Sequence, residues 1–266
     1  MGETVTMKLR AADGVLLAAT HRLPRPDAVE GLAVVFGHGF TGSARKRPVR
    51  RVVTAFSRYA GVIAIDFRGH GRSGGLSTLG GTEVLDIDAA VQWARARGYT
   101  RVVTVGASMG GSVVVRHAAL HRGVDAVVSV SAPSRWYVRD TAPMRRVHWL
   151  VEQRLGRLVS RALLGIRLAN GWDAVPESPV EVAGRIAPTP LLVVHGDADP
   201  YFTVEHPAAL VEAAGGNAEL WLIEGYGHGE GAMDAGLADR IGRWIAAHGV
   251  TGAVDVASGS SGTIPT

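Results

Sequence analysis

Residues 101–121 read RVVTVGASMGGSVVVRHAALH, and this stretch decides the fold. The run Arg101–Val105 is rich in valine and ends at a glycine, which is typical of a buried β-strand. A helix is predicted over Met109–His121, so only a short turn separates the two elements. That turn, residues 106–110, fits the motif G-x-S-x-G, in which a sharp strand-to-helix turn exposes the serine hydroxyl. Ser108 is therefore the candidate nucleophile.

Short apolar runs alternate with helical stretches on both sides of this turn. Continuous β-branched runs are typical of parallel strands buried on both faces, and an opening hairpin is predicted around the Asp13-Gly14 turn. We therefore predict an α/β fold with a mostly parallel, doubly wound sheet. The predicted strands are Val5–Arg10, Val15–Leu23, Leu32–Phe36, Val62–Asp66, Arg101–Val105, Val124–Val130, Leu191–Val194 and Glu219–Ile223, and the predicted helices are Ala44–Tyr59, Thr82–Arg97, Met109–His121, Val204–Ala214 and Ala235–Ala247.

One segment, residues 134–186, breaks the alternation, and it is too long for a plain loop. We predict that it forms a helical cap, inserted into a core made of residues 1–133 and 187–248. The remaining residues, 249–266, are rich in Gly, Ser, Thr and Ala and are expected to be a disordered tail. One apolar helical face is predicted in the cap at Val147, Val151, Leu155, Leu158 and Ala162.

Composition excludes several classes of protein. The 266 residues, 47% of them apolar, suit one large domain or one domain with an insertion. The absence of cysteine excludes disulfides, thiolate metal sites and a cysteine nucleophile. No apolar run reaches the roughly 18 residues of a membrane span, and residues 1–10 do not resemble a signal peptide, so we expect a cytoplasmic protein without integral membrane association.

The chain has a net charge of +4, and arginine supplies almost all of its positive charges. Basic runs with interleaved aromatics are missing, which argues against nucleic acid as the main partner. Between Ser134 and Leu168 there are eight arginines and only two acidic residues, Asp140 and Glu152. Two interpretations stay open for this basic cap: a solvated face of an amphipathic helix, or a surface that attracts acidic substrates or anionic lipid.

A serine hydroxyl needs a histidine base, and the histidine needs a carboxylate that fixes its tautomer. His228 is the candidate base, because it follows the last predicted strand and lies between glycines. The carboxylate is expected after the strand Leu191–Val194, where Asp197 and Asp199 both qualify by position. His195 lacks a third ligand at suitable spacing, so no metal site is predicted.

The reaction also needs two amides that stabilise an oxyanion. The amide of Met109, directly after the nucleophile, is one candidate. The amide of Phe40 is the best second candidate, since the glycines around it let the backbone approach the substrate. A simple turn leading into a helix capped by Ser43 is the alternative interpretation of this loop.

A second G-x-S-x-G match occurs at Gly71–Gly75, with Ser73 at its centre. This serine sits in a glycine-rich loop that neither leaves a strand directly nor opens a helix. The required context of strand, turn and helix is therefore missing, and Ser73 is not predicted to be a nucleophile.

Four motifs in order resemble the α/β-hydrolase superfamily, from about Lys8 to Ala247. They are His38-Gly39-Phe40, similar to the oxyanion loop; Asp66-Phe67-Arg68-Gly69-His70-Gly71-Arg72-Ser73, similar to a structural turn; His195-Gly196-Asp197-Ala198-Asp199, similar to the acid loop; and Gly227-His228, similar to the base loop. The resemblance implies that Asp199 is the acid. Within the superfamily, the first two motifs are most similar to small intracellular esterases of the feruloyl-esterase-like, monoacylglycerol-lipase-like and serine-aminopeptidase-like kinds.

The sequence therefore predicts a cofactor-independent serine hydrolase that cleaves small carboxylic esters through an acyl-enzyme. Ser108, His228 and Asp199 are the expected catalytic residues, with Phe40 and Met109 as the oxyanion hole. The same triad also serves thioesterases, carbon–carbon bond hydrolases, peptidases and cofactor-free perhydrolases, which stay open. A non-catalytic ligand-binding protein of the same fold is the alternative from another class. The oligomeric state is not predicted.

Overall fold

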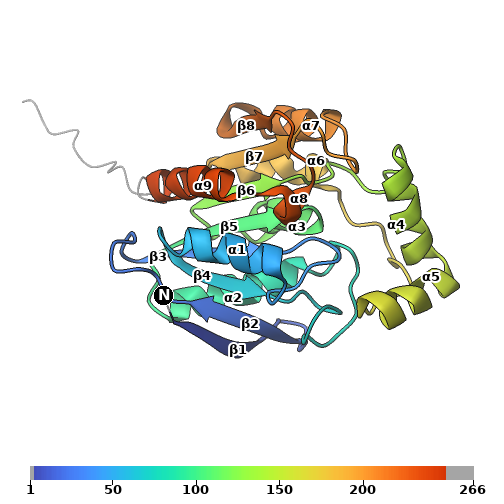
Figure 1. The fold of residues 1–266 in the computed structure, drawn as a ribbon, viewed down its shortest axis with the longest axis horizontal. Helices are drawn as coiled ribbons and strands as arrows, with labels where there is room; N and C mark the ends of the chain where they lie inside the picture. Colours follow the sequence, from blue (N-terminus) through green and yellow to red (C-terminus); the bar gives the residue numbers. More distant parts are fainter. Residues whose placement is uncertain (1–2, 250–266) are drawn as a thin grey trace, which may run out of the picture.

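An eight-stranded sheet forms the centre of the molecule (Figure 1), in a computed structural model that describes residues 3–249. The strand order is β1-β2-β4-β3-β5-β6-β7-β8. Strand β2 pairs antiparallel with both β1 and β4, and all other neighbouring strands are parallel. The strands are β1 Thr4–Arg10, β2 Leu16–Arg22, β3 Leu32–Gly37, β4 Gly61–Ile65, β5 Arg101–Ala107, β6 Ala126–Val130, β7 Leu191–Gly196 and β8 Ala218–Ile223.

Helices cover both faces of the sheet. Within β3, Ala33 and Val35 pack on one side together with α2, α3 and α7, whereas Val34 and Phe36 pack on the other side with α1 and α9. This burial of successive strand residues on opposite faces explains the continuous apolar runs of the sequence. The flanking helices are α1 Arg47–Phe56, α2 Val84–Ala96, α3 Met109–His121, α7 Glu205–Ala214, α8 Gly229–Ala232 and α9 Ala235–His248, and the 3₁₀ turn η3 Gly215–Asn217 follows α7.

The predicted fold class is confirmed. Each predicted strand is present within two residues of its expected bounds, and the hairpin forms with Lys8 opposite Ala18. Helix α1 begins three residues later than predicted. Lys46 is its N-cap and Pro48 lies in its first turn, where the lack of an N–H costs nothing. The expected tail over 249–266 lies outside the described residues, except for Gly249.

The segment predicted as a cap contains several short helices. Helices α4 and α5 stand beside the sheet, at the right of Figure 1. The later elements α6 and η2 pack against α3 and α7 instead. The elements between residues 134 and 186 are α4 Ala142–Glu152, α5 Arg154–Val159, the π-helix η1 Ser160–Leu164, α6 Pro179–Val182 and the 3₁₀ turn η2 Ala183–Ile186.

The continuous apolar face predicted across this segment is wrong. Gln153 has extended backbone angles (φ −85°, ψ 138°) and separates α4 from α5. The guanidinium of Arg157 donates to the carbonyls of Val151 and Glu152, which satisfies acceptors left open at the end of α4. As a result Leu158, expected on the buried face, is 63% exposed.

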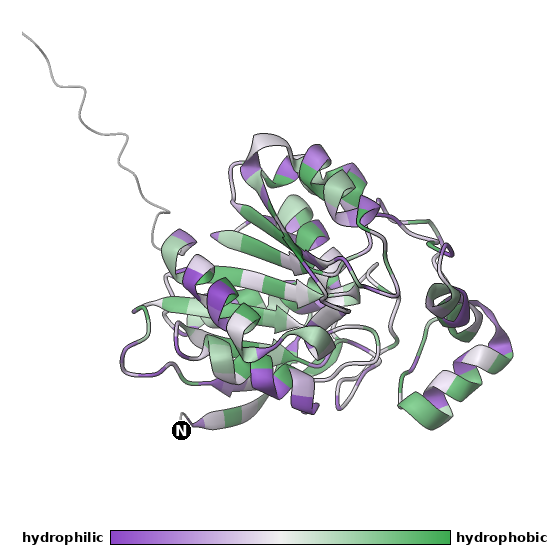
Figure 2. Ribbon diagram, turned by 45° about the horizontal axis from the view of Figure 1, so that its top comes forward, coloured by the Kyte–Doolittle hydropathy of each residue, from purple (hydrophilic) through white to green (hydrophobic). Residues whose placement is uncertain are grey.

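Hydropathy follows this arrangement (Figure 2). The strands are predominantly apolar, and the helices that flank the sheet alternate between apolar and polar residues. This is the pattern of a sheet buried between two helical layers, each exposing a polar stripe to water.

Candidate active site

Ser108 lies at the turn between β5 and α3, with φ +53° and ψ −118°. A positive φ is strained for serine, and the turn tolerates it only because its neighbours are small. A Cβ atom on Gly106 would collide with the carbonyl of Gly110, and one on Gly110 would collide with the carbonyl of Gly37. Both glycines of the motif are therefore required by the close backbone packing that projects Ser108 from the sheet edge.

Three side chains predicted to act together form one hydrogen-bonded chain. The Oγ of Ser108 lies 2.8 Å from Nε2 of His228, and Nδ1 of His228 lies 2.7 Å from Oδ2 of Asp199. The Asp199 side chain is fully buried. Because a carboxylate only accepts, Nδ1 carries the proton, and Nε2 is left to accept the serine hydroxyl.

The structure separates the two aspartates of the acid loop. Asp199 faces His228, and its other oxygen accepts the backbone N–H groups of Tyr201 (2.8 Å) and Phe202 (3.2 Å). Asp197 instead accepts the backbone N–H of Gly225 at 2.7 Å. Asp197 therefore braces the neighbouring loop and does not reach the histidine.

The side chain of His195 stabilises the acid loop through a hydrogen bond to its backbone. Its Nε2 donates to the carbonyl of Phe202 at 3.0 Å, and the ring is almost fully buried. Burial lowers its pKa, which favours the neutral ring. Among residues 3–249 the structure contains no group of three His, Asp or Glu side chains suited to a metal ion.

The loop predicted to form the oxyanion hole is held by side chains beneath it. The carbonyl of Gly39 accepts Nδ1–H of His38 at 2.7 Å and the N–H of Gly42 at 2.8 Å. This carbonyl belongs to the same planar peptide as the N–H of Phe40, so fixing one fixes the direction of the other. Within the described residues, the amides of Phe40 and Met109 donate no hydrogen bond, so both are free to bind an oxyanion.

Two buried histidines maintain this loop. His38 is fully buried, and burial lowers its pKa to about 3, so its neutral ring also accepts the N–H of Phe67 at 3.1 Å. Nε2 of His70 donates to the carbonyl of Phe40 at 2.7 Å. The sequence motif His38-Gly39-Phe40 therefore encodes a braced backbone rather than a reactive histidine.

Ser73, the centre of the second motif, occupies a structural position. Its side chain is 2% exposed, donates to the carbonyl of Asp66 and accepts the N–H of Ala18 at 2.8 Å. The hydroxyl is thus fully engaged and far removed from solvent, in agreement with the sequence-based interpretation.

Sequence reasoning missed two polar residues that contact the site. The Oε1 of Glu230 accepts the N–H of Gly39 at 3.3 Å, and burial raises the pKa of this carboxyl. The Oγ of Ser131, buried at the end of β6, accepts the N–H of Gly229 at 3.0 Å. Glu230 lies two residues after His228, a signal that was available. Nothing in the sequence distinguishes Ser131 from other strand-end serines.

The comparisons with known proteins identify the fold. The family model described as the alpha/beta hydrolase fold matches residues 33–157. The esterase Pf2001 of Pyrococcus furiosus superposes with a TM-score of 0.69 at 24% identity, covering 92% of each chain. The chain has the α/β-hydrolase fold.

Other solved structures share this α/β-hydrolase fold. Est1E of Butyrivibrio proteoclasticus, solved with ferulic acid bound, has a TM-score of 0.60 at 22% identity, over 91% of this chain and 96% of that one. XC6422 of Xanthomonas campestris, described as a serine hydrolase without a lid, has a TM-score of 0.62 at 19% identity, over 92% and 93%. No curated protein matches the chain.

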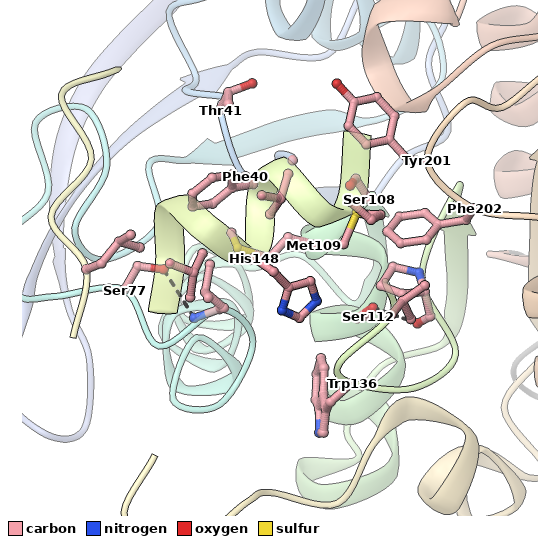
Figure 3. Close-up of a pocket in the computed structure, with 18 of the residues that line it drawn as sticks. Phe40, Thr41, Ser77, Ser108, Met109, Ser112, Trp136, His148, Tyr201 and Phe202 are labelled. Atoms are coloured by element: carbon pink, nitrogen blue, oxygen red, sulfur yellow. Dashed lines mark hydrogen bonds between the residues drawn. The ribbon is translucent and has the colours of Figure 1, made fainter. Parts of the chain in front are cut away.

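Ser108 lines a cavity of about 780 Å³. Figure 3 shows Phe40, Trp136 and Phe202 around the cavity, with His148 of α4 reaching toward it. Helix α4 also contributes Val147 to the wall. The cavity is therefore bounded by the core on one side and by the predicted cap on the other, and most of its surface is carbon.

The helices of the structure were also compared with the requirements of a membrane span. Between residues 3 and 249, no helix combines the length and the apolar character that crossing a bilayer requires.

Proposed function

We propose that this chain is a serine hydrolase that cleaves carboxylic esters through an acyl-enzyme intermediate. The observation that carries the proposal is the chain of hydrogen bonds from Ser108 through His228 to Asp199, opening into an apolar cavity. A serine, a base and a buried carboxylate in this order are what nucleophilic acyl transfer requires.

The first half of the reaction forms the acyl-enzyme. The Oγ of Ser108 attacks the ester carbonyl carbon while its proton passes to Nε2 of His228. The carboxylate of Asp199 stabilises the imidazolium, and the amides of Phe40 and Met109 bind the oxygen on which negative charge develops. The tetrahedral intermediate then collapses, the bond to the leaving oxygen breaks, and His228 gives its proton to the departing alcohol.

The second half releases the acid. His228 removes a proton from a water molecule, and the resulting hydroxide attacks the acyl carbon. The same two amides bind the second oxyanion. Collapse returns the proton to Ser108 and leaves the carboxylic acid as product. No step uses a cofactor.

An ester is favoured by the lining of the cavity. Aromatic and aliphatic side chains from both the core and helix α4 enclose the space beside Ser108, which suits an acyl chain or an aromatic acid. The esterases among the structural neighbours support the same class. We also propose that residues of the cap, His148 and Val147 among them, set the specificity.

A substrate panel tests the proposal. Wild type and Ser108→Ala are assayed with 4-nitrophenyl esters of increasing acyl length, a thioester and a peptide 4-nitroanilide. We expect the esters to be turned over fastest, and Ser108→Ala to lower turnover by several orders of magnitude. Faster turnover of the thioester or the anilide would overturn the ester assignment, and binding without turnover would identify a ligand-binding protein.

A further inference from the structure

A second cavity lies beside the one that holds Ser108, under the cap. It has a volume of about 700 Å³ and is open to solvent. Four arginines line it: Arg154, Arg157, Arg161 and Arg167. Three of these come from α5 and η1 (α5 is at the right of Figure 1), and the fourth follows η1 in the chain.

The two cavities share part of their wall. Leu168 and Asn170 line both of them, so the arginine-lined space adjoins the cavity that contains Ser108. Leu76 and Leu158 complete the second cavity with exposed carbon surface. The wall shared by the cavity of the nucleophile and the group of cations is therefore formed by one apolar and one amide side chain.

In the part of the chain that the structure describes, no carboxylate forms an ion pair with these four arginines. The two carboxylates between residues 134 and 168 are engaged elsewhere, Asp140 with Arg135 and Glu152 with Arg139 and His148. The cavity thus keeps its full positive charge, and an anion entering it needs to displace no internal partner.

Two of the guanidinium groups are held in place by the backbone. Arg157 donates to the carbonyls of Val151 and Glu152, and Arg167 donates to the carbonyl of Ser73. A guanidinium has five N–H groups, so each retains donors for a ligand. Because these side chains are already ordered, binding costs less rotamer entropy than at a free surface arginine. Within the described residues, the side chains of Arg154 and Arg161 make no hydrogen bond.

We propose that the substrate carries, besides its scissile ester, an anionic group that is bound by these four arginines. This group is a phosphate or a carboxylate and lies remote from the ester. The carbon skeleton of the substrate crosses Leu168 and links the anion to the acyl carbon at Ser108. Arginine suits this role because its planar fork pairs with both carboxylate and phosphate oxygens. The inference rests on the proposed esterase function and adds to it the substrate class.

Matched substrate pairs test the proposal. With the anion on the acyl side, mono-4-nitrophenyl esters of linear dicarboxylic acids are compared with 4-nitrophenyl esters of monocarboxylic acids of the same carbon number. With the anion on the alcohol side, a 1-acylglycerol 3-phosphate is compared with the 1-acylglycerol. All substrates are kept below their aggregation concentrations. We expect wild type to prefer the anionic member in at least one pair, and the preferred pair tells which side carries the anion.

Single arginine variants locate the effect. Arg154→Ala and Arg161→Ala each remove an exposed cation that lines the cavity. Arg146→Ala removes a cation of α4 that is also exposed but does not line the cavity. We expect the first two to lower kcat/KM for the anionic ester about fivefold, mostly through KM, because the contact is made equally in the ground and transition states. Arg146→Ala should change neither substrate. Turnover of the neutral ester, unchanged in all three variants, reports intact folding.

Four results would overturn the inference. The first is that wild type shows no preference for the anionic ester in any pair, and the second is that the preference is unchanged in both Arg154→Ala and Arg161→Ala. The third is an equal loss in Arg146→Ala, which would indicate only the diffuse field of a basic cap. The fourth is a preference that appears only after anionic vesicles are added, which would indicate a lipid surface. Failure of the proposed function looks different, because neither member of any pair would then be hydrolysed.

Discussion

Replacing Asp199 by Asn is expected to lower kcat by about 10⁴, which corresponds to about 5 kcal/mol of transition-state stabilisation. One oxygen of Asp199 accepts two backbone amides, those of Tyr201 and Phe202. An asparagine keeps its single oxygen there, so its NH₂ group faces His228. The ring must then accept at Nδ1 and carry its proton on Nε2, where it can no longer take the proton of Ser108.

Asp197→Asn is the matched control, because it makes the same isosteric change and the same change in charge two residues away. The oxygen of an asparagine at this position can still accept the N–H of Gly225. We expect kcat within about twofold of wild type, as for other exposed substitutions that keep their contacts. Steady-state hydrolysis of a 4-nitrophenyl ester measures both variants, and urea unfolding checks that each is folded. A larger loss in Asp197→Asn than in Asp199→Asn would refute the reasoning.

Three further variants probe the surroundings of the site. Burial raises the pKa of the Glu230 carboxyl above its ordinary value of 4.5, so ionising this group costs more in the folded chain than in the unfolded one. The unfolding free energy of Glu230→Gln should therefore rise relative to wild type as the pH increases from about 4.5, and a pH-independent difference in urea titrations would contradict this. Ser131→Ala leaves the N–H of Gly229 buried without its acceptor. The free energy of unfolding in urea should fall by about 1–3 kcal/mol and kcat should also fall, whereas wild-type values of both would show that the contact is unimportant. Ser73→Ala should lose stability for the same reason yet retain ester turnover within a few fold, and an inactive but folded variant would contradict its structural role.

Local sequence patterns predict most of the strands and helices of the fold. The parallel strands β3 to β7 are buried on both faces, so each appears in the sequence as an uninterrupted apolar run, such as Leu32–Phe36. The turn at Ser108 was recognisable because a strand, a small-residue turn and a helix follow one another without a gap. Likewise His228 and Asp199 follow strands that end at the same edge of the sheet, which explains why residues distant in the chain meet.

Other features depend on contacts that no local pattern reveals. The break at Gln153 is supported by Arg157, which lies on the next helix, so the periodicity of the apolar residues alone predicted an uninterrupted face. The role of Ser131 depends on a contact with Gly229, almost a hundred residues away. The choice between Asp197 and Asp199 needed either the family resemblance or the coordinates, since both positions fit the loop equally well by spacing.

The measurement that most directly tests the central claim is covalent labelling with a fluorophosphonate, followed by mass-spectrometric mapping of the modified residue. We predict one labelled serine, Ser108, because among the serines between residues 3 and 249 it alone combines a hydrogen bond to His228 with neighbouring free amides. Ser108→Ala should abolish labelling. Ser112→Ala, which removes another serine that lines the same cavity but donates to the carbonyl of Pro133, should leave it intact. Labelling that persists in Ser108→Ala and maps to Ser73 or Ser112 would contradict the account.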